Sequence, residues 1–244
     1  MNDTVLITGV SSGVGLSLTE YLSRKYHVLA VARQGQAIQD AFRHNRNVTT
    51  YCIDLAKPEE LESGLGHILE NHPYIPYVIN NAGVNRGGTF DSLDMDDVMR
   101  SFRVNCFAPL YILKKTIPAM KAHNFGRVIN VTSGAPLNCF PGYGAYSSSK
   151  GALNAFTVTA AKECNDYNIK INLMSPGPVR SNMAPDAPMP PSVCHPTVDY
   201  LLSLDENGPS GRFFWLGYEI PLFPELEGIS WLEGKADERY RRVL

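Results

Sequence analysis

Short apolar runs alternate along this chain with longer segments in which apolar residues recur every three or four positions. The runs predict strands that are buried on both faces, at 5–7, 27–32, 48–53, 77–79, 127–131, 169–174 and 212–216. The longer segments predict helices, the clearest at 15–25, 57–71, 92–123, 143–165 and 197–204. This alternation predicts an α/β fold, with about seven parallel strands and helices on both faces of one doubly wound domain over 1–244.

Prolines interrupt the alternation at two places. Pro109 lies inside the helix expected over 92–123 and predicts a kink or break near it. Five prolines lie between 184 and 196, so no helix interior is expected there. We expect 184–204 to form a flap on the substrate side, and its proline-rich part to be the least ordered segment without a ligand. The remainder, 225–244, is a charged and aromatic tail with a basic last turn at Arg239, Arg241 and Arg242.

Composition and charge exclude several classes of function. The 244 residues are 44% hydrophobic and 19% charged, with a net charge of −2 and no block of one sign. Nucleic-acid and membrane-surface binding therefore have no electrostatic support. No apolar run approaches the roughly 18 residues of a membrane span, and no signal peptide is recognisable, so a cytoplasmic protein is expected. The five scattered cysteines form no C-x-x-C pair, which predicts buried free thiols and no metal site.

A glycine-rich turn follows the first strand. Thr8–Gly15 reads T-G-x-x-x-G-x-G, with glycines at 9, 13 and 15. Glycine permits a tight turn and a close approach of backbone to a ligand, and the N–H groups at a helix start can hold a diphosphate. This position between strand and helix favours a nucleotide loop over a glycine-rich turn that binds nothing.

Residues after the next three strands are candidates for the rest of a dinucleotide site. Arg33 stands where an acid would bind the 2′-hydroxyl of NAD, and arginine there suits the 2′-phosphate of NADP. NADP(H) is therefore expected, with NAD(H) as the alternative and a plain surface arginine also open. Asp54 either accepts from an adenine amino group or caps its own loop. Asn81, Ala82 and Gly83 would let the backbone lie against a ribose.

The stretch from Ser133 to Lys150 carries the candidate chemistry. Tyr146 and Lys150 are four residues apart in a predicted helix, and therefore share one face of it. A nearby ammonium lowers the pKa of a phenol toward the working pH of an acid–base catalyst. Ser133, at the end of a strand, could hydrogen-bond an oxygen that gains negative charge. Asn105 is either a buried core amide or part of a helix kink that holds a water near Lys150.

Taken in order, these motifs resemble the short-chain dehydrogenase/reductase family. The resemblance rests on T-G-x-x-x-G-x-G, on N-N-A-G at 80–83, on Asn105, on Ser133, on Y-x-x-x-K at 146–150 and on Pro176–Gly177, and it covers roughly 4–183. It implies a Rossmann fold, a nicotinamide cofactor and homodimers or homotetramers built on long helices. The helix at 143–165 is apolar on several sides, which agrees with an oligomer contact.

The resemblance also implies residue roles. The catalytic residues would be Ser133, Tyr146, Lys150 and Asn105. The cofactor would contact Gly9, Ser11, Ser12, Gly13, Val14, Gly15, Arg33, Asp54, Leu55, Asn81, Ala82, Gly83, Tyr146, Lys150, Pro176, Gly177, Val179 and Ser181. The expected function is an NADP(H)-dependent oxidoreductase that interconverts a small-molecule carbonyl and a secondary alcohol, with Tyr146 as acid and base. The alternatives are an epimerase or dehydratase that recycles its nicotinamide, and a non-catalytic cofactor-binding protein.

Overall fold

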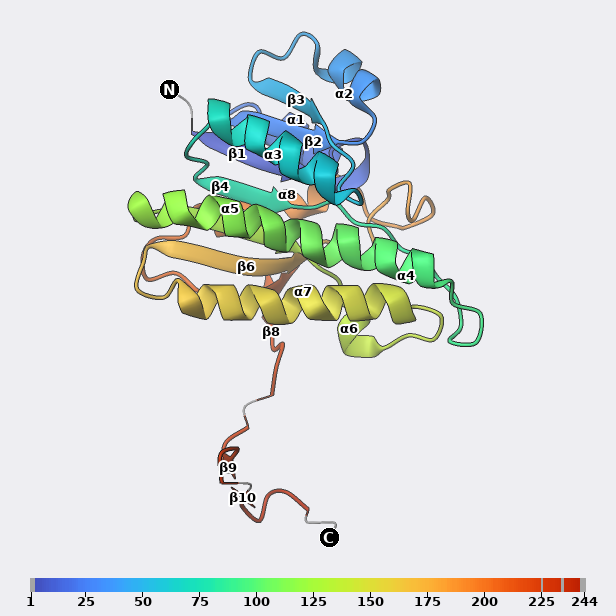
Figure 1. Ribbon diagram of the computed structural model, residues 1–244, viewed down its shortest axis with the longest axis vertical. Coiled ribbons are helices and arrows are strands. Elements are labelled where there is room, and N and C mark those ends of the chain that lie inside the picture. The colour runs from blue at the N-terminus through green and yellow to red at the C-terminus, as the bar shows by residue number, and fades with distance from the viewer. Residues whose placement is uncertain (1–2, 225, 234, 242–244) are drawn as a thin grey trace.

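Eight strands form one sheet in the order β3-β2-β1-β4-β5-β6-β7-β8 in the computed structural model, which describes residues 3–224, 226–233 and 235–241 (Figure 1). Every neighbouring pair is parallel except β7 and β8. The strands are β1 (Thr4–Thr8), β2 (His27–Ala32), β3 (Val48–Cys52), β4 (Tyr77–Asn80), β5 (Gly126–Val131), β6 (Ile169–Ser175), β7 (Phe213–Trp215) and β8 (Tyr218–Ile220). The tail adds a small antiparallel pair, β9 (Ile229–Ser230) and β10 (Lys235–Ala236).

Helices cover both faces of this sheet. They are α1 (Gly13–Leu22), α2 (Gly35–Phe42), α3 (Pro58–Asn71), α4 (Met95–Phe102), the π-helix η1 (Arg103–Phe107), α5 (Ala108–Ala122), α6 (Ala135–Asn138), α7 (Gly144–Glu163), the 3-10 helix η2 (Pro191–Cys194) and α8 (His195–Leu202). In Figure 1, α3, α5 and α7 lie in front of the sheet, and α8 lies behind it. The predicted doubly wound α/β class is therefore confirmed.

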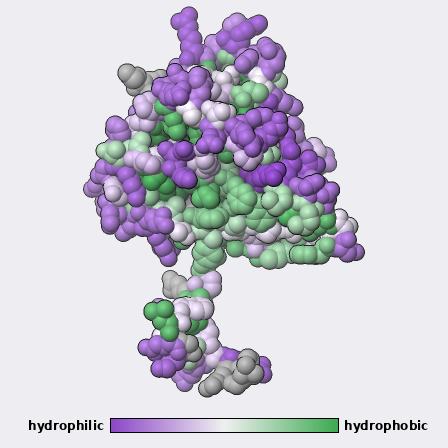
Figure 2. Space-filling view, in the orientation of Figure 1, coloured by the Kyte–Doolittle hydropathy of each residue, from purple (hydrophilic) through white to green (hydrophobic). Residues whose placement is uncertain are grey.

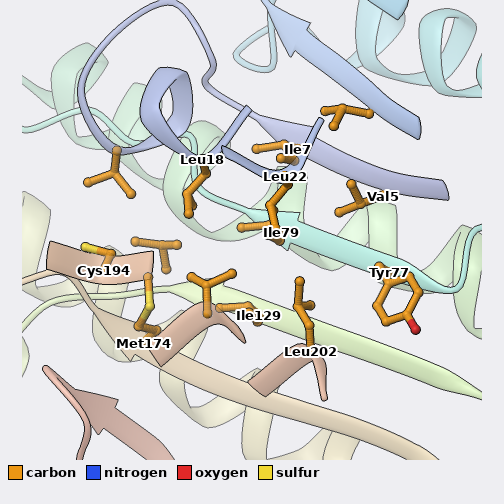
Figure 3. Packing of buried hydrophobic residues seen from close by; sticks show 14 of the residues in the cluster. Val5, Ile7, Leu18, Leu22, Tyr77, Ile79, Ile129, Met174, Cys194 and Leu202 are labelled. Atoms are coloured by element: carbon orange, nitrogen blue, oxygen red, sulfur yellow. The ribbon is translucent and has the colours of Figure 1, made fainter. Parts of the chain in front are cut away.

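Two apolar cores follow from the two-residue period of the strands. Val5 and Ile7 point to one face and pack with Leu18 and Leu22 of α1, as Figure 3 shows from close by. Leu6 points to the other face, into a core that α3 and α5 complete. Because both faces are covered, the strands read as continuous apolar runs and not as alternating ones.

The kink or break predicted near Pro109 takes the form of a π-helix that interrupts the α-helix. The segment expected as one helix over 92–123 divides into α4, η1 and α5. An α-helix would join the Asn105 carbonyl to the N–H of the residue four positions later, which is Pro109 and has none. The wider turn of η1 accommodates this missing donor, because Ala108 donates back to the Arg103 carbonyl instead.

Several elements differ from the predictions. The sheet has eight strands and not seven, because β8 folds back beside β7. Helix α2 was not predicted, since its eight residues bury only Ile38 and Phe42. Helix α8 begins at His195, inside the segment expected to be irregular. Pro196 fits there because the first turn of a helix needs no N–H donor from it.

The proline-rich segment is tied to its neighbours by backbone bonds. Arg180 N donates to the Met189 carbonyl at 2.9 Å, and Met189 N donates to the Pro178 carbonyl at 3.2 Å. Prolines between 184 and 191 therefore shape a defined loop, which leads into η2 and α8. The segment that we expected to be an irregular flap is therefore more regular than predicted.

The tail leaves the body of the molecule after β8, as Figure 1 shows. Its expected basic turn is not helical in the described residues. Arg239 instead pairs with Asp237 at 2.9 Å and with Glu227 at 3.4 Å. Arg242 lies outside the described residues.

Two cysteines depart from the expectation of buried thiols. Cys52 and Cys139 are exposed, whereas Cys106, Cys164 and Cys194 are buried. No described helix is long and apolar enough to cross a membrane. Within the described ranges, no three His, Cys, Asp or Glu side chains gather in a group that could hold a metal ion.

Candidate active site

The glycine-rich turn joins β1 to α1 with almost no room for side chains. Gly9 has a φ of +73°, and a Cβ placed on it would lie 2.6 Å from the Cα of Ala82. A Cβ on Gly15 would overlap the carbonyl oxygen of Gly9. Glycine at these two positions therefore lets the start of α1 approach both β1 and the turn after β4.

Side-chain to backbone bonds hold that turn to the end of β1. Asn81 donates through Nδ2 to the carbonyls of Thr8 at 2.9 Å and Gly9 at 3.1 Å. Thr8 Oγ1 accepts from the backbone N–H groups of Asn81 and Ala82, at 3.1 and 3.0 Å. The T-G and N-N-A-G motifs, some seventy residues apart, thus form one structural unit at the carboxyl edge of the sheet.

Polar pairs fix α7 against β5. Asn130 Nδ2 donates to Thr157 Oγ1 at 2.8 Å, and Thr132 Oγ1 donates to Asn154 Oδ1 at 2.6 Å. Both bonds are buried, so they are shielded from competing water. They set the register between the strand that leads to Ser133 and the helix that carries the Y-x-x-x-K residues.

Lys150 is buried beneath the cleft and has a strong acceptor. Its Nζ donates to the Val131 carbonyl at 2.7 Å. Burial disfavours the charged ammonium and lowers the pKa of Lys150 to about 8. Its charge is therefore retained at neutral pH and lost in mildly alkaline solution.

The phenol of Tyr146 behaves differently from the expectation. Burial raises the pKa of Tyr146 above its ordinary value of 10.0, and the nearby Ser133 hydroxyl opposes this rise. Lys150 donates a hydrogen bond to the Val131 carbonyl and makes none to the phenol. In the protein alone, desolvation of Tyr146 thus outweighs the expected lowering of its pKa by Lys150.

Asn105 is a fully hydrogen-bonded buried amide. Its Oδ1 accepts from Val84 N at 2.8 Å, and its Nδ2 donates to the Val84 carbonyl at 2.8 Å and to Ser149 Oγ at 3.0 Å. The side chain therefore joins η1 to α7 and to the segment after N-N-A-G. The first of the two readings, a buried core amide, is confirmed, and a water held near Lys150 stays a prediction.

These elements enclose a cleft of about 380 Å³. It is lined by Ser133, Tyr146 and Lys150 together with Gly9, Ser11, Ser12, Gly13, Val14, Arg33, Asp54, Leu55, Asn81, Ala82, Gly83, Pro176, Gly177, Val179 and Ser181, all of which the sequence singled out. Gly15 and Asn105 are buried and are not among its lining residues. Lining residues that the sequence reasoning missed are Val31, Ala32, Gln34, Ile53, Val84, Val104, Val131, Thr132, Ser175, Pro178, Asn182, Met183 and Ala184.

The missed residues carry one common signal. Nearly all lie within two positions of a predicted residue, so extending each motif by one or two positions would have found them. Ala184 is the exception, because it lies three positions beyond Ser181. It comes with Met183 from the loop after β6, and both line the same cleft as Tyr146.

Asp54 and Arg33 lie at the opposite end from Tyr146. Asp54 Oδ1 accepts from Ala56 N at 3.0 Å, so its carboxylate does cap its loop. Its Oδ2 lies 4.0 Å from Arg100 Nη2. Arg33 is exposed and follows β2 directly. Because no acidic residue follows β2, the end of that strand presents a positive side chain to the cleft.

Comparisons with known proteins agree with this geometry. A family model described as short chain dehydrogenase matches residues 3–189. An Escherichia coli (strain K12) protein described as the uncharacterized oxidoreductase YbbO is 32% identical over 183 residues, covering 74% of this chain and 67% of that protein.

Two solved structures share the fold at lower identity. The NADPH-bound carbonyl reductase from chicken fatty liver has a TM-score of 0.80 at 21% identity, covering 91% of this chain and 100% of that one. A 4-hydroxyisoleucine dehydrogenase mutant complexed with NADH and succinate has a TM-score of 0.80 at 23% identity, covering 87% and 96%. One of these proteins holds NADPH and the other NADH, so the fold accommodates either nicotinamide cofactor.

Proposed function

This chain belongs to the short-chain dehydrogenase family of oxidoreductases, and on that premise we propose that it interconverts a carbonyl and a secondary alcohol with NADP(H). The observation that carries the proposal is the convergence of Ser133, Tyr146 and Lys150 in one cleft with the glycine-rich turn. A phenol, a hydroxyl and an ammonium meet there at the carboxyl edge of the sheet, where open α/β sheets bind ligands.

The walls of the cleft suit a dinucleotide. Gly13 has a φ of +57°, and a Cβ on it would lie 2.8 Å from Ser181 Cβ. The space between these two residues therefore has no room for a side chain at position 13. Ser12 precedes α1 without using its side chain to cap the helix. The free N–H groups at this helix start would hold the diphosphate, and Asn81 to Gly83 would border the adjacent ribose. A bound nicotinamide would supply or accept the hydride.

The residues of this chain provide the proton chemistry. Tyr146 donates a proton to the substrate oxygen during reduction and takes it back during oxidation. Ser133 donates a hydrogen bond to the same oxygen as negative charge develops on it. Lys150 supplies a positive charge beneath the site, held in place by the Val131 carbonyl at 2.7 Å. Asn105 positions η1 and α7, and its carbonyl, which Pro109 leaves without an α-helical donor, would anchor a relay water.

A preference for NADP(H) rests on charge at the end of β2. Arg33 is exposed, lines the cleft and makes no salt bridge among the described residues. A guanidinium is matched to the 2′-phosphate of NADP, whereas a ribose hydroxyl gains more from a carboxylate acceptor. Asp54 is turned to its own loop and does not replace that acceptor.

Substitution of Tyr146 by phenylalanine tests the proposal. Tyr146→Phe keeps the ring and removes the proton, so we expect kcat to fall about 1,000-fold while the dissociation constant of NADPH changes less than twofold. Tyr218→Phe is the matched control, because Tyr218 is 66% exposed on the edge strand β8 and is not a lining residue of the cleft. Turnover of a confirmed substrate at the wild-type rate by Tyr146→Phe would refute the mechanism.

Following NADPH during turnover separates this proposal from the epimerase or dehydratase alternative. An oxidoreductase consumes one NADPH for each carbonyl that it reduces. An enzyme that recycles its nicotinamide forms product without net loss of NADPH absorbance. The second result, obtained with any substrate, would replace the proposed reaction while leaving the cofactor site intact.

We also propose a homodimer or homotetramer built on the long helices. Phe107, which precedes α5, is 45% exposed, and Phe156 on α7 is 40% exposed. Large apolar side chains on neighbouring helices are typical of a surface that a second copy covers. Light scattering of the protein should give a multiple of 26.9 kDa, and Phe156→Glu should lower that mass.

A further inference from the structure

Exposed apolar side chains lie on segments next to Tyr146, and one of them, Met183, also lines the cleft. We call Phe90, Leu137, Phe140, Tyr143 and Met183 the apolar rim; they are 89%, 44%, 52%, 41% and 46% exposed. Figure 2 shows hydrophobic surface along the lower right of the body, where Figure 1 places α6 and the start of α7. These side chains come from three segments that are distant in sequence.

The apolar rim is continuous with the candidate catalytic phenol. The rings of Tyr143 and Tyr146 are 6.4 Å apart and nearly perpendicular. Phe140 continues the series with its ring 6.2 Å from Tyr143, in the same edge-to-face arrangement. Met183 lines the cleft together with Tyr146. An aromatic row thus extends outward from the phenol, with a methionine from the loop after β6 in the same cleft.

The loop after N-N-A-G brings Phe90 to this row. Gly88 N donates to the Gly142 carbonyl at 3.0 Å, and Gly88 forms a bridge with Tyr143. A Cβ placed on Gly144 would lie 3.4 Å from Cε2 of Phe90. The Phe90 ring therefore lies against the first residue of α7, two positions before Tyr146.

Charge is almost absent from the same region. No Asp, Glu, Lys, Arg or His occurs between Arg127 and Lys150. In the loop that carries Phe90, Arg86 is engaged by Asp97 at 3.5 Å, and Asp91 accepts from the Thr89 hydroxyl. The backbone of Arg180 lies beside the glycine-rich turn, since its carbonyl is 3.6 Å from a Cβ placed on Gly13. The loop that carries Phe90 and the segment 128–149 therefore offer a substrate carboxylate no unpaired cation.

We infer that the substrate is an uncharged carbonyl compound, or the matching alcohol, with a bulky aromatic or branched apolar group beside the reacting carbon. This inference rests on the proposed function and specifies its substrate class. The apolar group would pack on Phe140, Tyr143 and Met183 while Tyr146 and Ser133 hold the oxygen. Covering exposed aromatic surface favours such a substrate, and a charged one would lose its hydration without a partner.

Matched ketones test the inference with NADPH as the reductant, because reduction of a ketone gives a secondary alcohol. Methyl 4-acetylbenzoate and 4-acetylbenzoate have the same ring and reacting group but differ in one negative charge. Cyclohexyl methyl ketone and acetone differ in apolar bulk. We expect kcat/KM to be at least tenfold higher for the neutral ester than for the carboxylate, and at least tenfold higher for cyclohexyl methyl ketone than for acetone.

Rim variants connect any preference to the apolar rim. Phe140→Ser should lower the ratio of kcat/KM for the ester to that for acetone about fivefold, mainly through KM. Phe223→Ser is the matched control, since Phe223 is 53% exposed, follows β8 and is not a lining residue of the cleft. The same change in ratio for both variants would overturn the assignment of the apolar rim to the substrate.

The outcomes also separate this inference from the proposed function. Equal or better use of 4-acetylbenzoate, with NADPH consumed, would overturn the substrate class and leave the oxidoreductase proposal standing. Absence of NADPH oxidation with all four ketones, and of NADP reduction with their alcohols, would count against both. A preference for the ester over acetone that Phe140→Ser lowers and Phe223→Ser retains supports the inference.

Discussion

The two ends of the cleft are built by opposite means. At the nucleotide end, backbone approaches backbone, and Asn81 and Thr8 join distant turns through four hydrogen bonds. At the substrate end, large side chains such as Phe90 and Phe140 are partly exposed to solvent, and the segments that carry them meet through the backbone bond from Gly88 to Gly142. The first end tolerates almost no change in side-chain volume, whereas the second can exchange one side chain for another without disturbing the sheet.

The difference shows where each kind of specificity is located. A constant ligand can be met by glycine turns and main-chain groups, since these have a fixed shape. A variable ligand needs side chains on loops that a rigid scaffold supports. At the nucleotide end, substitutions of Gly15, Lys150 and Arg33 should show how far stability and cofactor affinity depend on backbone packing, burial and charge.

The largest effect is expected from Gly15→Ala. A Cβ at this position overlaps the Gly9 carbonyl and would lie 2.5 Å from Asn81 Nδ2, so the turn must open. We expect the free energy of unfolding to fall by about 4 kcal/mol, measured by urea denaturation. Gly66→Ala is the control, because Gly66 lies in α3 with nothing within 4 Å of an added Cβ.

Gly66→Ala should stabilise the protein by about 0.5–1 kcal/mol, since alanine favours a helix. A Gly15→Ala variant as stable as the wild type would contradict the strict nucleotide end. The contrast between the two ends of the cleft would then depend on charge alone and not on backbone packing.

The next effect concerns the buried ammonium between the two ends. The pKa of Lys150 is about 8 in the folded chain, below its ordinary 10.5. Between these values the unfolded chain holds a proton that the folded chain has released, so stability rises with pH. We expect Lys150 to contribute a gain of roughly 3 kcal/mol from pH 8 to 10.5, at about 1.4 kcal/mol for each pH unit.

Urea denaturation of the wild type and of Lys150→Met at pH 8.0 and 9.5 isolates this contribution. The difference in free energy of unfolding between the two proteins should move in favour of the wild type at the higher pH. Burial also raises the pKa of the Cys194 thiol to about 12, and the pH dependence that this adds is common to both proteins. A pH-independent difference would mean that the pKa of Lys150 is not lowered.

The smallest effect is expected at the outer edge of the nucleotide end. Arg33→Ala should weaken NADPH about tenfold, or about 1.4 kcal/mol, and should change NADH binding less than twofold. Fluorescence titrations of both cofactors measure this, and added salt should shrink the NADPH advantage. Arg43→Ala removes the same charge from the surface next to α2 and should leave both affinities unchanged. Tighter binding of NADH by the wild type would contradict the proposed preference.

The nucleotide end could be predicted from sequence, and the family match over 3–189 confirms the family that its motifs indicated. Backbone or side-chain atoms lie too close to Gly9, Gly13 and Gly15 for a Cβ. The spacing of these glycines had already predicted such a tight turn. The kink at Pro109 was likewise predictable, because a missing N–H is a local property. Helix α2 was not, since Ile38 and Phe42 alone give too little periodicity.

The substrate end and the electrostatics were not predictable in the same way. Phe90, Phe140 and Met183 lie in loops, where no period shows which side chains meet. The upward shift in the pKa of Tyr146 depends on burial, which a sequence does not give. Sequence identified Tyr146 and Lys150 as neighbours, but only the structure shows that Lys150 donates to Val131.

The Asn81 bonds to Thr8 and Gly9 have a consequence for the speed of binding. They form entirely within the protein, so this part of the receptor has its final shape before any dinucleotide arrives. Little conformational entropy is then lost on association, and the encounter requires no prior refolding of the turn. The on-rate for the reduced cofactor should accordingly approach the range set by diffusion and orientation, about 10⁵–10⁷ M⁻¹s⁻¹, in stopped-flow measurements.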